Sequence, residues 1–329
     1  MDKPRVFVTR RIPEEGIAVL ERMAEVTIWT DELPPPHEIL LREVMRSDGL
    51  LCMLTDKIDI DVMDAGPNLK VISNYAVGVD NIDVQAATDR GIAVGNTPGV
   101  LTETTADLAF ALLLATARRI VEADKYLRAC GWRAWGPTLF LGQDAHNATL
   151  GIVGMGRIGR EMARRAKGFS MPILYTNPSP SPEVEEEFGA KRVSLDDLLR
   201  QSDFVSIHTP LTPETRHLIS EREFDLMKPT AILINTARGP IVDQKALYQA
   251  LSNGKIAGAG LDVFEEEPVD CGDPLLALDN VVAVPHIGSA SVATRTKMAV
   301  MAAENIIAGL KSEPLPHPVN TVSIPGGTK

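Results

Sequence analysis

The fold of this chain is decided by one stretch, residues 149–160, with the sequence Thr-Leu-Gly-Ile-Val-Gly-Met-Gly-Arg-Ile-Gly-Arg. Its apolar start predicts a strand over 150–153, and the pattern after the glycines predicts a helix over 158–167. A strand, a G-x-G-x-x-G turn and a helix in this order predict a dinucleotide-binding unit. Gly154 allows the tight turn, Gly156 lets the backbone approach a pyrophosphate, and Gly159 lets the helix pack closely on the strand.

The start of the helix after the glycines is the second half of this prediction. Its first turn has unpaired backbone N–H groups and a partial positive charge, both of which favour bound phosphate. We therefore expect the pyrophosphate of a dinucleotide to lie against Gly154, Met155, Gly156, Arg157, Ile158 and Gly159.

Two series of alternating strands and helices surround this motif. From the motif onward, strands are predicted at 150–153, 172–175, 204–207, 231–235, 257–261 and 281–284. With helices between them, they predict a six-stranded, doubly wound parallel sheet of the Rossmann type. An earlier series, with strands at 5–9, 25–29, 49–53, 71–74 and 92–94, predicts a second parallel-sheet α/β domain that lacks the glycine motif.

Three further segments lie outside these series. A helix predicted over 102–119 is apolar all round, so we expect it to be buried between domains or against another subunit. A second long helix is predicted over 291–310, and the Pro- and Gly-rich tail, 311–329, is expected to return to the surface. The segment 131–137 contains two of the three tryptophans and predicts either a loop packed on its own domain or a dimer arm.

Composition excludes several classes of protein. The 329 residues carry a formal charge of −11, from 33 basic and 44 acidic side chains, which argues against a nucleic-acid or anionic-membrane binder. Three scattered cysteines without C-x-x-C spacing suggest neither disulfides nor a zinc site, and nothing else suggests a metal. The start of the chain has no apolar stretch of signal length, and no apolar run could span a bilayer, so we expect a cytoplasmic protein.

Three charged side chains follow predicted strands of the second series. Arg238 lies after the strand at 231–235, Glu267 after the strand at 257–261, and His286 after the strand at 281–284. Each alone is an ordinary loop residue. Because the carboxyl ends of parallel strands meet at one edge of a sheet, we expect the three to form one site behind the glycine turn.

At this point the sequence resembles the D-isomer-specific 2-hydroxyacid dehydrogenase family over essentially the whole chain. The motifs that carry the resemblance are Gly-Met-Gly-Arg-Ile-Gly at 154–159, Asn-Thr-Ala-Arg-Gly at 235–239, Leu-Asp-Val-Phe-Glu-Glu-Glu-Pro at 261–268 and Pro-His-Ile-Gly-Ser at 285–289. Within the family the chain is most similar to the glyoxylate/hydroxypyruvate reductases. That similarity rests on Asn-Tyr-Ala-Val-Gly-Val-Asp-Asn at 74–81, Leu-Thr-Glu-Thr-Thr-Ala-Asp at 101–107 and the tryptophan segment.

The resemblance implies a domain order and an activity. A coenzyme domain, residues 100–286, would be inserted into a substrate domain made of residues 1–99 and 287–329, with the two long helices as crossovers. The activity would be NAD(P)H-dependent reduction of a small 2-keto acid, such as glyoxylate to glycolate or hydroxypyruvate to D-glycerate. A homodimer would form through the 102–119 helix and an arm at 131–147.

The resemblance also implies roles for residues. Arg238 would bind the carboxylate and keto oxygen, His286 would donate the proton, and Glu267 would orient the imidazole. The implied substrate-binding residues are Met53, Leu54, Val77, Gly78, Arg238, His286 and the partner's Trp135. Besides the glycine turn, the implied cofactor-binding residues are Thr104, Asn177, Pro178, Ser179, Thr209, Pro210, Thr236, Ala237, Arg238, Asp262, His286 and Gly288.

The cofactor and the substrate stay open at this stage. The strand end at Asn177 has no carboxylate to bind a ribose 2′-OH, and no Arg or Lys occupies positions 177–182. We therefore expect use of both NADH and NADPH, with a preference for NADPH. Alternative interpretations are a D-3-phosphoglycerate or D-lactate type dehydrogenase and, outside enzymes, a dinucleotide-sensing corepressor, which the short termini disfavour.

Overall fold

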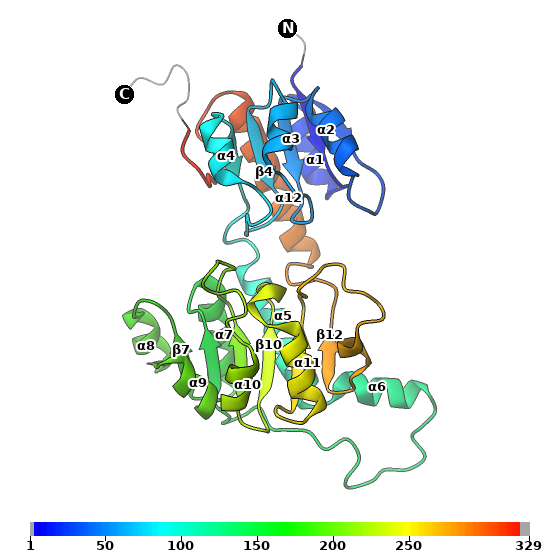
Figure 1. Cartoon of the computed structure of the whole chain (residues 1–329), viewed down its shortest axis with the longest axis vertical. Helices are drawn as coiled ribbons and strands as arrows, with labels where there is room; N and C mark the ends of the chain where they lie inside the picture. Colours follow the sequence, from blue (N-terminus) through cyan, green and yellow to red (C-terminus); the bar gives the residue numbers. More distant parts are fainter. Residues whose placement is uncertain (1–2, 323–329) are drawn as a thin grey trace. The chain divides into compact units, whose positions relative to one another are not determined.

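The computed structural model describes residues 3–322 (Figure 1). By its internal contacts the chain divides into two compact units, one made of residues up to 101 together with those from 289 onward, the other of residues 102–288. These boundaries differ by two residues from those expected from the sequence. Within residues 3–322, no helix has the length and apolar character needed to cross a membrane.

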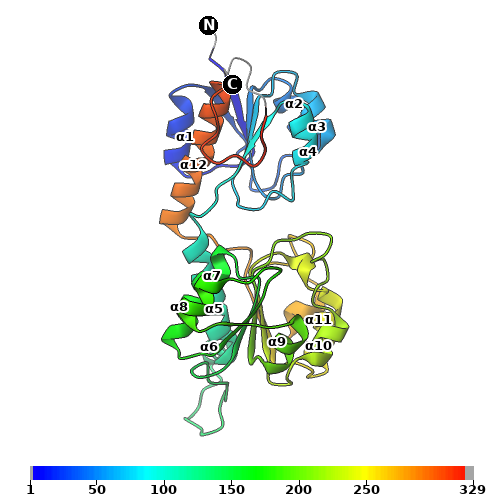
Figure 2. The ribbon, with the colours of Figure 1, turned by 90° about the vertical axis from the view of Figure 1, so that its left-hand side faces the viewer.

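The first unit contains a five-stranded parallel sheet in the order β2-β1-β3-β4-β5, the flavodoxin-like order. Helices α1 and α12 cover one face, and α2, α3 and α4 cover the other (Figure 2). Burial on both faces explains why strands such as β3 and β4 are buried throughout. The elements are β1 (Arg5–Val8), α1 (Glu14–Glu21), β2 (Glu25–Ile28), α2 (His37–Val44), β3 (Gly49–Cys52), α3 (Ile60–Ala65), β4 (Val71–Asn74), α4 (Val84–Asp89), β5 (Ala93–Gly95) and α12 (Val292–Leu310).

The second unit contains a seven-stranded parallel sheet in the order β12-β11-β10-β9-β6-β7-β8, with the Rossmann order at its centre. The predicted doubly wound α/β fold is therefore confirmed. The elements are α5 (Thr102–Ala117), α6 (Ile120–Arg128), β6 (Leu150–Val153), α7 (Arg157–Gly168), β7 (Ile173–Thr176), α8 (Pro182–Phe188), β8 (Lys191–Arg192), α9 (Leu195–Gln201), β9 (Phe204–Ile207), α10 (Glu221–Leu226), β10 (Ile232–Asn235), η1 (Gly239–Ile241), α11 (Gln244–Ser252), β11 (Gly258–Leu261), η2 (Pro274–Ala277) and β12 (Val281–Ala283).

Helix α5 packs within its own unit against α7, β10 and β11, which bury one side of it, including Leu112 and Leu113. Its other side is not fully covered, since Ala111 is exposed and Leu114 half-buried. It ends at Ala117, before the expected Arg119, because Arg119 has a positive φ of 53° and starts the separate helix α6.

Two elements of the second unit were not predicted. Helix α6 has no buried residue, although it contains apolar side chains, among them Ile120 and Leu127, that stay exposed. Strand β8 consists of two exposed, charged residues that pair with β7, so the sheet has seven strands and not the expected six. Two charged residues carry no apolar pattern that could predict a strand.

The tail after α12 returns to the sheet of the first unit. Pro318 forms a bridge with Gly95, and the N–H of Val319 donates to the carbonyl of Val94 at 2.7 Å. Asn320 Oδ1 accepts from the N–H of Val94 at 2.8 Å, which closes the ladder on the edge strand β5. Residues 323–329 of the predicted tail lie outside the described residues.

Candidate active site

The three glycines between β6 and α7 are required for different reasons. Gly154 has a φ of 95°, and a Cβ there would lie 2.7 Å from the backbone nitrogen of Thr209. A Cβ at Gly159 would lie 2.3 Å from the carbonyl oxygen of Gly154. A Cβ at Gly156, in contrast, meets nothing within 4 Å. The protein itself therefore demands glycine at 154 and 159, whereas at 156 it leaves open space in front of the backbone.

That open space fits a bound dinucleotide. Gly156 is the N-cap of α7, and no side chain caps the free N–H groups of the first turn. At the end of β10, Thr236 is 7% exposed, and its hydroxyl has no hydrogen-bond partner among the residues that the structure describes. A bare helix start and an unsatisfied buried hydroxyl at one sheet edge suit the phosphates and hydroxyls of such a ligand.

The end of β7 lies beside the glycine turn. Asn177 Oδ1 accepts a hydrogen bond from the N–H of Met155 at 3.4 Å, and its Nδ2 donates to the carbonyl of Ser179 at 3.1 Å. Asn177 therefore occupies the strand tip where an acidic residue binds the ribose 2′-OH in NAD enzymes. Its neutral amide leaves that position without a negative charge.

The loop after β10 carries Arg238 and is shaped by two neighbours. Asn235 Nδ2 donates to the carbonyl of Arg238 at 3.0 Å, and Asn235 Oδ1 accepts from the N–H of Ala237 at 3.0 Å. Next to Arg238, a Cβ at Gly239 would lie 1.8 Å from the carbonyl oxygen of Phe264. This close approach brings the loop after β11, which contains Glu267, against the loop of Arg238.

His286 and Glu267 form a hydrogen-bonded pair at this edge. His286 Nδ1 donates to Glu267 Oε2 at 2.6 Å, and Glu267 Oε1 accepts from the N–H of Phe264 at 3.0 Å. The two side chains are 27% and 24% exposed. Burial raises the pKa of Glu267, but the hydrogen bond and charge of His286 outweigh burial and hold that pKa below its ordinary value. Both carboxylate oxygens are engaged, so the imidazole is fixed with Nε2 left for other chemistry.

Asp262 organises the backbone around His286. Its two carboxylate oxygens accept from the N–H groups of Ile287, at 2.6 Å, and Gly288, at 2.8 Å, and its carbonyl accepts from the N–H of His286 at 2.9 Å. This network holds His286 at a positive φ of 51°, a conformation that costs free energy for a residue other than glycine. Burial raises the pKa of Asp262 to about 6.

In the first unit, the loops after β3 and β4 carry the expected substrate-binding residues. Asp56 accepts from the N–H of Met53, at 2.7 Å, and from the hydroxyl of Thr9. Asn81 Nδ2 then donates to the carbonyls of Met53 and Asp56, both at 3.0 Å. This network ties the loop of Met53 and Leu54 to the next loop along the sheet edge.

That next loop presents two peptide groups. The carbonyl of Val77 accepts from Asn96 Nδ2 at 2.7 Å, and the carbonyl of Gly78 accepts from Asn74 Nδ2 at 2.8 Å. The N–H groups of these two residues have no acceptor within residues 3–322. Two fixed peptides with unused N–H groups are suited to an anion.

The expected site residues thus fall into three places. The residues expected to bind the cofactor or to act in the reaction lie at one edge of the second sheet, either after one of the strands β6, β7, β9, β10, β11 and β12 or in the first turn of α5. The residues expected to bind the substrate from the other domain, Met53, Leu54, Val77 and Gly78, belong to the first unit. Trp135 lies between α6 and β6 in the chain and is 78% exposed. Asn74, Asn81, Asn235 and Asp56 were not predicted as site residues, although an Asn or Asp directly after a strand is a usable signal.

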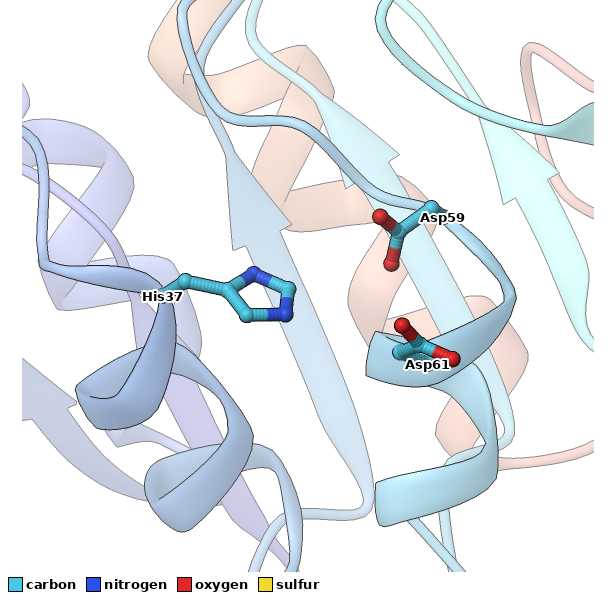
Figure 3. Close-up of side chains that lie close together, drawn as sticks. All are labelled: His37, Asp59 and Asp61. Carbon is cyan, nitrogen blue, oxygen red and sulfur yellow. The ribbon is translucent and has the colours of Figure 1, made fainter.

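His37, Asp59 and Asp61 also gather in the first unit (Figure 3). Asp59 is the N-cap of α3, accepting from the N–H of Val62 at 3.3 Å, and it pairs with Lys57 at 2.9 Å. The hydrogen bond from Lys57 lowers the pKa of Asp59. A bound cation would lie at the positive ends of α2 and α3 beside a lysine, so we assign Asp59 a capping role and no metal.

Comparison with known proteins agrees with this geometry. The family described as D-isomer specific 2-hydroxyacid dehydrogenase, NAD binding domain, matches residues 110–288. A glyoxylate reductase from Korarchaeum cryptofilum is 57% identical over 319 residues, 97% of this chain and 96% of its own. A Thermus thermophilus protein of known structure is 48% identical with a TM-score of 0.91, covering 96% of this chain and 100% of its own.

A further solved structure carries a cofactor. An NADPH-dependent glyoxylate/hydroxypyruvate reductase from Sinorhizobium meliloti, in complex with NADP and malonate, is 34% identical with a TM-score of 0.84 and covers 97% of each chain. These matches indicate an NAD(P)-dependent oxidoreductase and do not favour the phosphoglycerate, lactate or corepressor alternatives. The chain therefore belongs to the D-isomer-specific 2-hydroxyacid dehydrogenase family.

Proposed function

We propose that this protein reduces glyoxylate and hydroxypyruvate, small 2-keto acids, with a reduced nicotinamide dinucleotide. The observation that carries the proposal is the fixed pair of His286 and Glu267 at the same sheet edge as Arg238 and the open glycine turn. The names of the relatives described above support the choice of substrate class.

The residues present supply what the reaction needs from the protein. A bound nicotinamide would supply the hydride. His286 Nε2 donates a proton to the oxygen of the keto group, while Glu267 holds Nδ1 and fixes the orientation of the ring. Arg238 presents a planar guanidinium that can bind a carboxylate through two parallel hydrogen bonds. The reaction therefore draws on one acid and one anion-binding cation.

The loops of the first unit are proposed to complete substrate binding. The unused N–H groups of Val77 and Gly78 would bind a carboxylate oxygen, and the side chains of Met53 and Leu54 would limit the size of the substrate. Small apolar walls suit two- and three-carbon acids.

A substrate panel tests the proposed function. Oxidation of NADH and NADPH is followed at 340 nm with glyoxylate, hydroxypyruvate, pyruvate and 3-phosphohydroxypyruvate. We expect glyoxylate or hydroxypyruvate to give a kcat/KM at least about tenfold above the other two, since differences of 1–3 kcal/mol are typical of substrates that differ by one group. A clear preference for pyruvate or the phosphorylated acid would overturn the proposal.

Replacing Gly156 with alanine is expected to weaken cofactor binding without affecting the fold. The added Cβ meets no protein atom within 4 Å, so Tm should stay within about 2 °C of wild type, while the Kd for NADPH and NADH should rise at least about tenfold because the methyl group occupies the pyrophosphate side of the turn. Gly168→Ala, at the other end of α7 and also without a neighbour within 4 Å, is the matched control. Unchanged cofactor affinity in Gly156→Ala would place the pyrophosphate elsewhere.

Replacing Glu267 with glutamine is expected to lower kcat at least about tenfold. The two carboxylate oxygens accept from His286 Nδ1 and from the N–H of Phe264, whereas an amide has a single acceptor oxygen, so one of these two donors loses its partner and the imidazole is no longer held. Glu266→Gln, an exposed neighbour, is the control. A wild-type kcat in Glu267→Gln would show that this pair does not orient the imidazole for the reaction.

We also propose a homodimer formed through α6 and the arm that follows it. Large apolar side chains are exposed there, among them Leu127 at 54%, Trp132 at 57%, Trp135 at 78% and Leu141 at 64%. The side of α5 that its own unit leaves uncovered, with Ala111 and Leu114, is proposed to join this contact, so that the dimer forms through the 102–119 helix and the 131–147 arm. Analytical ultracentrifugation of wild type and Trp135→Ala tests the dimer, and a wild-type monomer at micromolar concentration would contradict it. Steady-state kinetics of Trp135→Ala test whether the partner's Trp135 reaches the substrate, because KM should then rise.

Preference for NADPH, with use of both cofactors, and a cytoplasmic location stay predictions.

A further inference from the structure

Strand β8 places one arginine at the end of β7. In the parallel register of β7 and β8, Arg192 is paired with Tyr175 and Lys191 with Leu174. The guanidinium of Arg192 donates to the carbonyl of Asn177 from Nε, at 3.1 Å, and from Nη2, at 3.0 Å, and to the carbonyl of Pro178 from Nη2 at 2.8 Å. The positive charge of Arg192 therefore lies at the end of β7, where residues 177–182 themselves contain no Arg or Lys.

The charge of Arg192 is not neutralised by a carboxylate. Other arginines of the second unit pair with acidic side chains: Arg160 with Glu183 at 2.7 Å, and Arg165 with Asp107 at 2.6 Å. No carboxylate in the described range 3–322 forms an ion pair with Arg192, and its Nη1 donates to no residue in that range. Backbone carbonyls hold the group in place but leave its full positive charge available.

Two acidic residues that follow the loop 177–181 are engaged in contacts of their own. Glu185 accepts from the hydroxyl of Tyr175 at 2.6 Å, and that hydroxyl accepts from the N–H of Ser181 at 2.8 Å. Glu183 pairs with Arg160. These contacts brace the end of the loop, and the charge of Glu183 is compensated by Arg160.

We infer that Arg192 binds the 2′-phosphate of NADPH and is the residue that sets cofactor preference in this chain. The inference rests on the proposed function, because it assumes that a dinucleotide binds along the glycine turn. In such a unit the adenosine ribose lies at the tip of the second strand, here Asn177, which touches both the glycine turn and Arg192. Arginine binds phosphate through its planar set of donors, and a neutral residue at 177 removes the repulsion that excludes it.

Binding of mononucleotides without turnover tests this inference. Titration calorimetry compares adenosine 2′,5′-bisphosphate with AMP on wild type, Arg192→Gln and the control Lys191→Gln, which removes the same charge one residue away on the same strand. In Arg192→Gln we expect affinity for the bisphosphate to fall about 10- to 100-fold, the usual range for a hydrogen-bonded charge, and affinity for AMP to stay within about twofold. Lys191→Gln should change neither, and kcat/KM should show the same pattern with NADPH and NADH.

Other outcomes would overturn the inference. Equal loss of both nucleotides would make Arg192 only a brace for the 177–181 loop. If Lys191→Gln lost as much affinity for the bisphosphate as Arg192→Gln, the effect would reflect the net charge of β8 and not a contact made by Arg192. Arg192→Lys keeps the charge but loses the planar donors, so we expect its affinity for the bisphosphate to lie between those of wild type and the glutamine variant; an affinity equal to wild type would show that charge alone, and not the planar donors of arginine, sets the preference. Because neither nucleotide is turned over, failure of the substrate panel would leave this result standing, and the reverse also holds.

Discussion

Replacing His286 with alanine is expected to lower kcat for keto-acid reduction by about 10²–10⁴-fold, the range for loss of a positioned general acid. The imidazole is the only proposed proton donor, and its orientation depends on Glu267 through a bond of 2.6 Å. The pyrophosphate and ribose contacts are proposed to lie at the glycine turn and the end of β7, so the Kd for the reduced cofactor should stay within about threefold of wild type. Stopped-flow single-turnover rates and fluorescence titration of NADPH measure the two quantities separately.

The second unit offers a matched control for this experiment. His217 also has a positive φ, 52°, and also pairs with a glutamate, Glu265. Alanine at either position therefore removes a similar pair from a similar backbone conformation. We expect His217→Ala to keep kcat within about fivefold once any change in Tm is taken into account. A kcat in His286→Ala within tenfold of wild type, or an equal loss in His217→Ala, would contradict the assignment of His286 as the acid.

Replacing Gly239 with alanine is expected to disable the site by displacing two loops. The new Cβ would lie 1.8 Å from the carbonyl oxygen and 1.9 Å from the carbonyl carbon of Phe264, backbone atoms that cannot move alone. Arg238 precedes the substituted residue, and the N–H of Phe264 holds Glu267. We expect kcat/KM to fall more than about 100-fold and Tm to fall by several degrees, since forced overpacking costs about 1–3 kcal/mol or more.

The measurement separates misfolding from displacement. Calorimetry gives Tm, and NADPH titration reports on the glycine turn, which lies on other strands and should bind cofactor within about fivefold of wild type. Gly168→Ala serves as the control, because its added methyl group meets nothing within 4 Å. Activity and Tm at wild-type level in Gly239→Ala would show that the loops after β10 and β11 do not need their close approach.

Much of the fold was predictable because its determinants are local. The strands of both sheets are short apolar runs bounded by turn residues, and most were placed within one or two residues. The glycine turn, too, was predictable from spacing. Only glycine readily adopts the φ of 95° at Gly154, and at Gly159 an added Cβ would lie 2.3 Å from the carbonyl oxygen of Gly154. Strand β8, which consists of two exposed charged residues, has no apolar pattern and was missed; α6 was missed although it does contain apolar side chains, which stay exposed.

What covers α5 could not be predicted for a related reason. A helix that is apolar on every side must be covered, but the sequence does not say by what. In the structure β10, β11 and α7 cover one side of it, while Ala111 on the other side is exposed. The hydrogen bonds of Asn81 in the first unit could not be predicted either. Its two partners are Met53 and Asp56, which lie 28 and 25 residues away in sequence.

The sequence by itself determined the order of the elements, the glycine turn and the kinds of groups that can act at the sheet edge, because apolar periodicity and turn chemistry are properties of neighbouring residues. Only the tertiary structure decided that the loop of Glu267 packs directly against the backbone of Gly239, and that the carboxylate of Asp262 accepts from the two N–H groups after His286. It also brought Arg192 to Asn177, 15 residues away, and so placed a cation at a strand tip where residues 177–182 contain no Arg or Lys. These contacts depend on the register between strands, which no local pattern encodes.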